Sequence, residues 1–324
     1  MSDFLEAERS RICKLIADDP ALFDGAVGGA LFMGAPRLFV LTEPDKNLYG
    51  PIRSSAISYF SSNGISWWRG KEVTGHTLSS QVACVNHLFA WRDDELAATA
   101  ILRGISADFV CALRIDSDQS GAGFVQFEAV SDHQYLNEDG LTRGAQCTSV
   151  DAMMYAERAD GSRCLVPIEW KYTEQYGDVN KATEGAAGDP LRGKGAVRRS
   201  RYDQLIAGSG QLKSADAAVY YFDPFYQLMR QTLLAEEMVR YRERERLRAD
   251  GFLHLHVIPS GNAALKDKTY ACSGLDMETT WRRQLVDQSR YRIVDPAELL
   301  APLAAFPKYS ELNKYLSARY WAGL

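Results

Sequence analysis

The strongest constraint on the fold is a pair of strand-like runs within residues 148–174, separated by a signal for a tight turn. Ser149–Ala156 and Arg163–Thr173 are both rich in apolar side chains, and Asp160-Gly161 lies between them. An Asp-Gly pair between two such runs is typical of a β-hairpin. We therefore expect two antiparallel strands here, around which the chain must build a sheet.

Charge gathers on one face of the second of these strands. Because strand side chains alternate, Glu169 and Lys171 share a face, and the opposite face is apolar. The hairpin would lay Asp151 beside Glu169. Carboxylates suit Mg²⁺, which takes one or two of them together with water and substrate phosphate, and a nearby lysine can position the attacking water and stabilise developing charge. The alternative is a solvated strand face, where charged residues are common.

The other predicted elements mix helices and strands in an order typical of an α/β or α+β layer protein. Helices are expected at 1–19, 52–60, 77–91, 96–105, 202–206, from 223 to about 248, and twice within 296–324, and strands at 108–115, 123–130 and 252–258. Residues 174–200 are polar and glycine-rich, which predicts a mobile loop.

Composition limits the classes of partner. The 324 residues are 46% hydrophobic and carry a formal net charge of −5, so we expect a sizeable core but no surface basic enough to coat nucleic acid. Any nucleic-acid partner must meet a local patch. The longest uncharged glycine-rich stretch, residues 25–36, is too short to span a bilayer, the first residues lack a signal-peptide pattern, and the six cysteines form no CxxC pair. These features predict a cytoplasmic protein with reduced cysteines and no membrane partner.

The hairpin also carries a resemblance to a known family. Asp151, seventeen intervening residues and then Glu169-Trp170-Lys171 resemble the D…(D/E)xK signature of the PD-(D/E)xK nuclease superfamily, the restriction-endonuclease-like fold. The helix expected before the hairpin, the helix expected after it and the strand expected at 252–258 follow an order that is similar to the αβββαβ core of this superfamily. Three further segments are similar to a bacterial branch of that superfamily: NLYGPIRSSAISYFSSNGISWW, HTLSSQVACVNHLF and DPFYQLMRQTLLAEEM.

The resemblance implies an α/β fold with a restriction-endonuclease-like core, whose central mixed sheet is flanked by helices. On this basis we divide the chain into a helical N-terminal extension (1–76), the nuclease-like core (77–260) and a helical C-terminal cap (261–324). We expect the three parts to pack as one compact unit.

The resemblance further implies a nuclease that hydrolyses phosphodiester bonds, with DNA as the expected polymer. Asp151 and Glu169 would bind Mg²⁺, for which Mn²⁺ can substitute, and Lys171 would position the attacking water. A homodimer is compatible with this interpretation.

Two departures from the family pattern concern the rest of the site. Val150 stands where the motif has proline, and the helix at 77–91 lacks the glutamate that many members carry on their first helix. Glu128, on a neighbouring strand, and Gln81, on that helix, are the candidates to complete the site, since Mg²⁺ needs further oxygen ligands. Their structural alternatives are an exposed strand residue and a buried, hydrogen-bonded amide.

A basic segment follows the hairpin and is a candidate for phosphate binding. It carries Arg192, Lys194, Arg198, Arg199 and Arg201. Contacts of this kind give salt-dependent affinity without sequence preference. Tyr202 follows directly and would either touch the nucleic acid with its neighbours Arg198, Arg199 and Arg201 or pack on the sheet.

Other interpretations lead to different functions. The fold can serve as a catalytically inactive module that binds nucleic acid or protein, with the acids as remnants. A hydrolase of another phosphoester would cleave nucleotides but not polymers. His254 and His256 share a strand face with a spacing used by metal sites, although without a cysteine or acid motif such a pair is more typical of packing.

Overall fold

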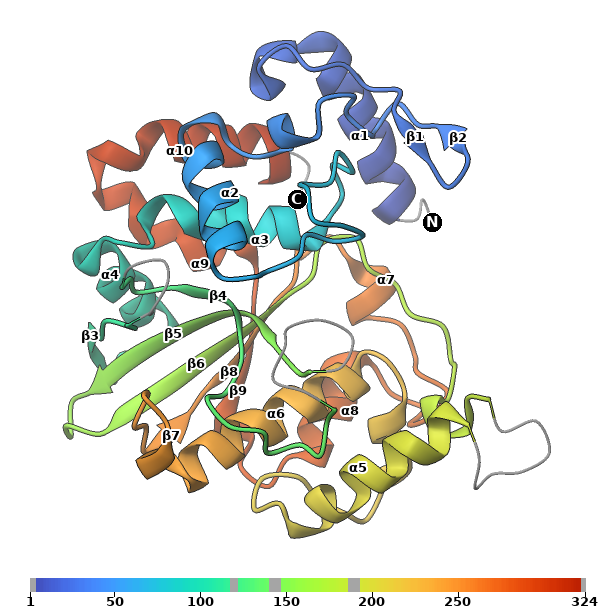
Figure 1. The fold of residues 1–324 in the computed structure, drawn as a ribbon, viewed down its shortest axis with the longest axis vertical. Helices are drawn as coiled ribbons and strands as arrows, with labels where there is room; N and C mark the ends of the chain where they lie inside the picture. Colours follow the sequence, from blue (N-terminus) through green and yellow to red (C-terminus); the bar gives the residue numbers. More distant parts are fainter. Residues whose placement is uncertain (1–3, 117–121, 140–146, 186–192, 322–324) are drawn as a thin grey trace.

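The computed structural model describes residues 4–116, 122–139, 147–185 and 193–321, and its centre is a mixed β-sheet (Figure 1). The predicted hairpin forms the middle of this sheet, as β5 (Val150–Arg158) and β6 (Arg163–Trp170). The strands β3 (Phe109–Ala112) and β4 (Gln126–Ala129) pair antiparallel with β5. On the other side, β7 (Gly251–Phe252) and β8 (His254–Val257) run parallel to β6, and β9 (Tyr291–Val294) runs parallel to β8.

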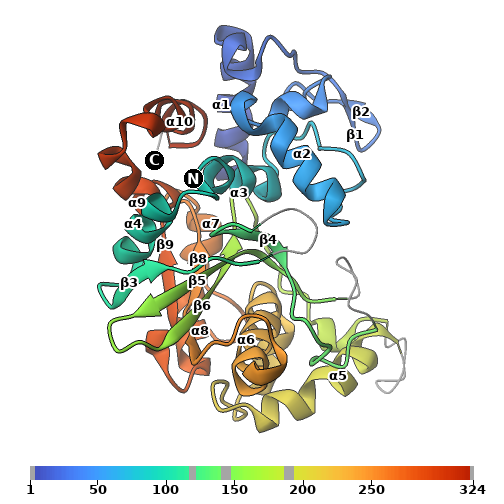
Figure 2. The same ribbon diagram turned by 60° about the vertical axis from the view of Figure 1, so that its left-hand side comes forward.

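Helices cover both faces of the sheet (Figures 1 and 2). One layer contains α1 (Phe4–Asp18), α2 (Arg53–Ser62), α3 (Ser80–Leu88), α4 (Glu95–Ile105), α9 (Pro296–Leu300) and α10 (Ser310–Leu316). The other layer contains α5 (Lys194–Gly208), α6 (Phe225–Arg240), α7 (Ala263–Lys266) and α8 (Met277–Gln284). A two-stranded ribbon, β1 (Leu31–Phe32) and β2 (Ala35–Pro36), projects from the first layer. The expected α/β fold, with a central mixed sheet flanked by helices, is confirmed.

The hairpin strands send alternate side chains into two separate cores. Val166, Ile168 and Trp170 pack in the core of the α3 layer, whereas Leu165 packs in the core of the α6 layer. The predicted alternation of β6 is therefore confirmed. The face that carries Glu169 lies under a helix layer, and Glu169 is only 4% exposed, which rules out a solvated strand face.

The sheet extends further along the chain than we predicted. β9 lies within the segment that we expected to be a helical cap, and it pairs in register with β8 from His254↔Tyr291 to Val257↔Val294. Four residues are too few for a periodic signal, so the pairing with β8 is what makes this segment a strand.

Two helix boundaries also differ from the prediction. α5 begins at Lys194, inside the expected loop, and the Gly195 N–H fixes its first turn by donating to the carbonyl oxygen of Glu184 (2.9 Å). α6 ends at Arg240 rather than near residue 248. The charged residues that follow turn away to form ion pairs, for example between Arg246 and Asp132 (2.8 Å).

The C-terminal turn ties the N-terminal segment to α3. The guanidinium of Arg319 is fully buried and donates to the carbonyl oxygen of Asn47 (2.6 Å), and Asn86 on α3 donates to the Tyr320 hydroxyl (2.8 Å). Beside them, Trp321 donates to Nε2 of His87 (3.1 Å), whose Nδ1 donates to the Ala83 carbonyl (2.6 Å). Within the described ranges, no helix is long and apolar enough to cross a membrane.

The burial of His87 under the C-terminal turn predicts that the folded chain loses stability in acid. Burial, with a contribution from nearby Arg319, lowers the pKa of His87 to about 3. In the unfolded chain this histidine takes up a proton near pH 6.5, whereas in the folded chain it stays neutral. Proton binding therefore stabilises the unfolded state relative to the folded state as the pH falls from 6.5 toward 3. At pH 5 we expect this one residue to lower the free energy of unfolding by about 2 kcal/mol relative to pH 8.

Urea denaturation of the wild type and of His87→Gln at pH 8 and pH 5 checks this expectation. The variant should lose less stability on acidification than the wild type, whatever its stability at pH 8. His133→Gln, at an exposed position, is the control and should follow the wild type. Parallel pH profiles for wild type and His87→Gln would contradict the assignment.

Candidate functional site

Three carboxylates lie in one row across neighbouring strands. The β5–β6 register pairs Ala152 with Ile168, so the next step along the hairpin sets Asp151 opposite Glu169. In the β4–β5 ladder, the pairs on either side of Glu128 set it opposite Asp151 in the same way. Directly opposed side chains on antiparallel strands are close neighbours on one face. The sheet therefore brings Glu128, Asp151 and Glu169 together.

Glu128 is held by α3 and by the start of β5. Its φ of 46° lies in the left-handed region, which costs a residue other than glycine about 1–2 kcal/mol. One carboxylate oxygen accepts a hydrogen bond from Gln81 Nε2 (2.8 Å), and the other accepts from Ser149 Oγ (2.9 Å). Gln81 lies in the first turn of α3, so the positive end of that helix faces the row of acids.

A buried ion pair closes the other end of the row. β6 ends at Trp170, and the Lys171 ammonium pairs with the carboxylate of Glu169 and donates to Gln227 Oε1 (2.5 Å). The second oxygen of Glu169 accepts from the amide of Gln231. Lys171 is only 5% exposed. Gln227 and Gln231 lie one turn apart on α6, so one helix face supplies both amides.

The pKa values within the row diverge. Burial, with the nearby charges of Glu169 and Glu128, raises the pKa of Asp151 well above its usual range. Burial alone would raise the pKa of Glu169, but Lys171 and Gln231 outweigh it and lower that pKa. Burial likewise opposes the charge of Lys171, but Glu169 outweighs it and holds the lysine pKa well above its usual range. At neutral pH the pair is ionised, and Asp151 is the group whose ionisation is opposed.

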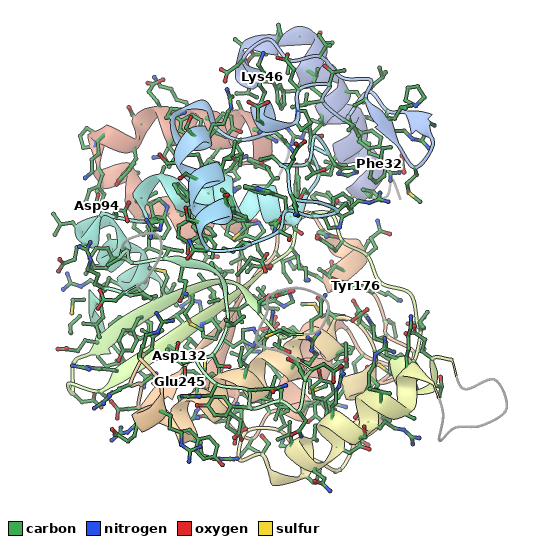
Figure 3. All side chains as sticks on the ribbon, viewed as in Figure 1. Phe32, Lys46, Asp94, Asp132, Tyr176 and Glu245 are labelled. Atoms are coloured by element: carbon green, nitrogen blue, oxygen red, sulfur yellow. The ribbon has the colours of Figure 1, made fainter. Side chains whose placement is uncertain are left out.

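The five predicted catalytic residues line one cavity of about 820 Å³. These residues are Gln81, Glu128, Asp151, Glu169 and Lys171. The wall of the α3 layer includes Trp67 and Trp68, and the opposite side includes Tyr176. In Figure 3, Phe32 on the projecting ribbon and Tyr176 lie on opposite sides of the space between the two helix layers. Throughout the described ranges, no group of three or more histidine, cysteine, aspartate or glutamate side chains is arranged to enclose a metal ion.

Part of the predicted nucleic-acid-binding set lines a second cavity, of about 840 Å³. Arg198, Arg201 and Tyr202 of α5 are among its lining residues, together with Lys181, Lys194, Tyr226 and Arg230. The Tyr226 ring has three cations within 6 Å of its centre: Lys181 (5.1 Å), Arg230 (5.4 Å) and Arg198 (5.7 Å).

Not every residue of the predicted set is placed to contact a ligand in this cavity. Tyr202 is 1% exposed and its hydroxyl donates to Glu138 (2.5 Å), so the packing alternative describes it better than direct contact with a ligand. Arg199 also lies on α5 but is not among the described residues that line the cavity. Arg192 lies outside the described residues.

A small third cavity of about 210 Å³ has lining residues in common with each of the other two. It shares Asp151, Glu169 and Gln227 with the cavity of the acids, and it shares Arg230 with the basic cavity. Gln227 and Arg230 lie three residues apart on α6, so this one helix contributes side chains to both the acidic and the basic cavity.

The sequence interpretation missed the residues that α6 contributes. Gln227, Arg230 and Gln231 have a helical spacing of three and four that is visible in the sequence. Glutamines at that spacing do not indicate a functional site by themselves, and their role becomes visible only when the helix is placed over the hairpin. His254 and His256 are buried in β8, where His254 contacts Gln231 (3.1 Å) and His256 contacts the Tyr291 hydroxyl (2.9 Å). Both histidines are therefore placed as buried, hydrogen-bonded side chains of the sheet, in agreement with the packing alternative.

The comparisons with known proteins give one positive finding. A family model described as "Restriction Endonuclease associating with ARP" (REase-ARP) matches residues 23–321. No curated protein and no solved structure matches the chain.

The crowding of the acids predicts a stabilising substitution. An unfolded aspartate loses its proton near pH 3.9, whereas Asp151 keeps its proton to higher pH, so its ionisation destabilises the folded chain as the pH rises above about 4. In EDTA, Asp151→Asn should therefore unfold less readily than the wild type at pH 8, by a free energy on the order of 1 kcal/mol.

Thermal or urea denaturation in EDTA at pH 4 and pH 8 provides the measurement, with the difference between the proteins expected to grow with pH. Glu157→Gln, on the same strand but away from the row, is the matched control and should show no such gain. A destabilised Asp151→Asn at pH 8 would show that the negative charge is favourable at this position.

Proposed function

This chain belongs to the REase-ARP family, restriction endonucleases associating with ARP, and we propose that it is a metal-dependent nuclease that hydrolyses phosphodiester bonds, with DNA as the polymer. The observation that carries the proposal is the row of three carboxylates that ends in a buried glutamate–lysine pair inside one cavity. Such a combination of acids and one ammonium suits the cleavage of an anionic phosphodiester.

The acids fit a hard divalent cation. Asp151 is destabilised in its ionised form by burial and by its two acidic neighbours, and a cation would relieve this repulsion. Mg²⁺ takes only one or two protein carboxylates and keeps several waters, so it needs no cage of three or more protein ligands. Asp151 and Glu169 are the proposed ligands of Mg²⁺ or Mn²⁺. When bound, such an ion would polarise the phosphate and make a coordinated water more acidic.

Lys171 is proposed to act as a charged hydrogen-bond donor. Because Glu169 holds the pKa of Lys171 well above its usual range, the side chain is a charged ammonium at neutral pH, which suits a donor better than a proton acceptor. Glu169 and Gln227 fix the direction of its ammonium group, which can orient a water and stabilise charge on the phosphate oxygens. Gln81 is proposed to position Glu128 as the third acid, since its amide holds one of the two carboxylate oxygens.

The basic cavity is proposed to hold neighbouring phosphates of the substrate. Arg198 and Arg201 line it, and each also pairs with a carboxylate, Glu184 and Asp139 respectively. A phosphate can exchange with such surface ion pairs, which are worth only about 0–1 kcal/mol each. Arg230 lines both this cavity and the small cavity that contains Asp151 and Glu169, and we propose that the two sites bind one strand. A contact between Arg199 and nucleic acid stays a prediction.

A cleavage assay tests the proposed chemistry. We expect the wild type to cut DNA with Mg²⁺ or Mn²⁺ but not with EDTA. Asp151→Asn, Glu169→Gln and Lys171→Met should each reduce the rate by about 100-fold or more, the scale of losing one positioned charge or donor. Glu157→Gln is the control with unchanged activity. Because Lys171→Met leaves a buried carboxylate without its partner, circular dichroism must show that it is folded.

Two outcomes would change the assignment. Metal-dependent cutting that survives in both Asp151→Asn and Glu169→Gln would move the active site elsewhere. DNA binding without cleavage by the folded wild type, with either metal, would favour the inactive binding module over the nuclease.

The basic cavity predicts a change in the salt dependence of binding. Arg198→Ala and Arg201→Ala should each weaken DNA binding at low salt. Each should also reduce the slope of log K against log salt by about 0.7–0.9, the contribution of one phosphate contact. Anisotropy titrations at several salt concentrations measure both quantities. Arg246→Ala, an arginine paired with Asp132 away from this cavity, is the control, and an unchanged slope in both α5 variants would contradict the phosphate assignment.

A further inference from the structure

An exposed aromatic group stands at the wall of the acidic cavity. Trp68 is 43% exposed and lines that cavity. Its ring lies 5.9 Å from that of Phe32, and the Arg69 guanidinium lies over both rings, at 5.0 Å from Phe32 and 5.5 Å from Trp68. We refer to Phe32, Trp68 and Arg69 as the aromatic platform. His76 supports it at 4.6 Å from the Phe32 ring.

The turn that presents the platform carries backbone strain. Trp67 and Gly70 pair across it, so Trp68 and Arg69 are its two central residues. Arg69 has a φ of 71°, at a turn position where glycine is normally favoured. An arginine there costs about 1–2 kcal/mol relative to a relaxed backbone. Strain of this kind tends to occur where the side chain has a binding role.

The platform is fixed relative to the acids by a short chain of hydrogen bonds. The backbone N–H of Trp68 donates to Gln81 Oε1 (2.7 Å), and Gln81 Nε2 donates to Glu128 (2.8 Å). One amide side chain therefore connects the aromatic turn to the carboxylate row. A ligand that contacts both features would meet them at a constant separation.

The acids share one cavity with Trp68 and Arg69 of the aromatic platform, in which an unpaired base would find a stacking face. Glu169 is 4% exposed and Lys171 is 5% exposed, inside a cavity of about 820 Å³. That volume is typical of sites for small molecules, whereas paired bases remain stacked inside a duplex. Unpaired bases, unlike paired ones, are free to stack on protein side chains. Exposed aromatic rings beside cations are the features that bind unpaired bases.

We propose that the aromatic platform stacks an unpaired base of the DNA strand whose phosphate reaches the row of acids, so that the substrate is single-stranded DNA. This inference rests on the proposed nuclease function for its catalytic meaning. Trp68 supplies the stacking face, and Arg69 supplies a positive charge next to it. The basic cavity, which shares Arg230 with the small cavity next to the acids, would hold the continuing backbone of the same strand.

Binding without cleavage tests the platform. The full chain carrying Asp151→Asn is titrated in EDTA against a fluorescent oligothymidine and a hairpin duplex of the same length, and binding is read by anisotropy. The oligothymidine should bind more tightly. Adding Trp68→Ala should weaken that binding by about 5- to 150-fold, the range for loss of one stacked base. Trp68→Phe should restore most of the affinity, and duplex binding should not change.

Arg69→Gly separates a binding role from a structural one. Glycine relieves the backbone strain at this turn, so the variant should melt at the same temperature as its parent or higher, yet bind oligothymidine more weakly. Tyr241→Ala is the matched control, because Tyr241 is also an exposed aromatic ring under an arginine, Arg244 at 5.2 Å. It should bind as its parent does.

The outcomes distinguish the platform from the nuclease. Unchanged oligothymidine affinity in Trp68→Ala, or a preference for the duplex, would overturn the platform even if the wild type cuts DNA. Trp68-dependent binding of oligothymidine by a protein that cuts no substrate would support the platform while overturning the nuclease.

Discussion

The repulsion among three carboxylates at the end of the hairpin is the constraint on which the rest of the site depends. Glu128, Asp151 and Glu169 come from adjacent strands, and the lysine that follows β6 neutralises only one of them. Their negative charge also affects α3, where burial together with these three acids raises the pKa of Cys84 well above its usual range. The first turn of α3 and the amides of α6 surround the row with donors, which keeps the charges in place and leaves Asp151 the least favourable of them.

The surrounding architecture extends this row into a path for a charged polymer. Trp68 and Arg69 of the aromatic platform line the cavity of the acids, whereas α5 and α6 line the basic cavity, and Arg230 of α6 is shared between that cavity and the small one next to the acids. The same helix therefore supplies amides to the acidic site and a cation to the basic site. In this arrangement bases, the phosphate to be cleaved and the continuing backbone each meet side chains of matching chemistry.

Much of the fold follows from local sequence, and the parts that do not follow depend on tertiary contacts. The hairpin was predictable because the Asp160-Gly161 turn and the alternation of β6 are local features, and they were enough to bring Asp151 beside Glu169. β9 was not predictable, since four residues form a strand only when β8 is present. The amides of Gln227 and Gln231 gain their role from the position of α6 over the hairpin. Their function in catalysis, like that of the acids, stays a prediction.

The central claim is that Asp151 and Glu169 together bind a divalent cation. Its most direct test is crystallographic, with crystals of the wild type and of Asp151→Asn soaked in Mn²⁺ and measured for anomalous scattering. The account predicts one strong peak in the wild type in contact with both carboxylates, and its loss or marked weakening in Asp151→Asn. A wild-type map without a peak at these two side chains, while Mn²⁺ is bound elsewhere on the same chain, would contradict it.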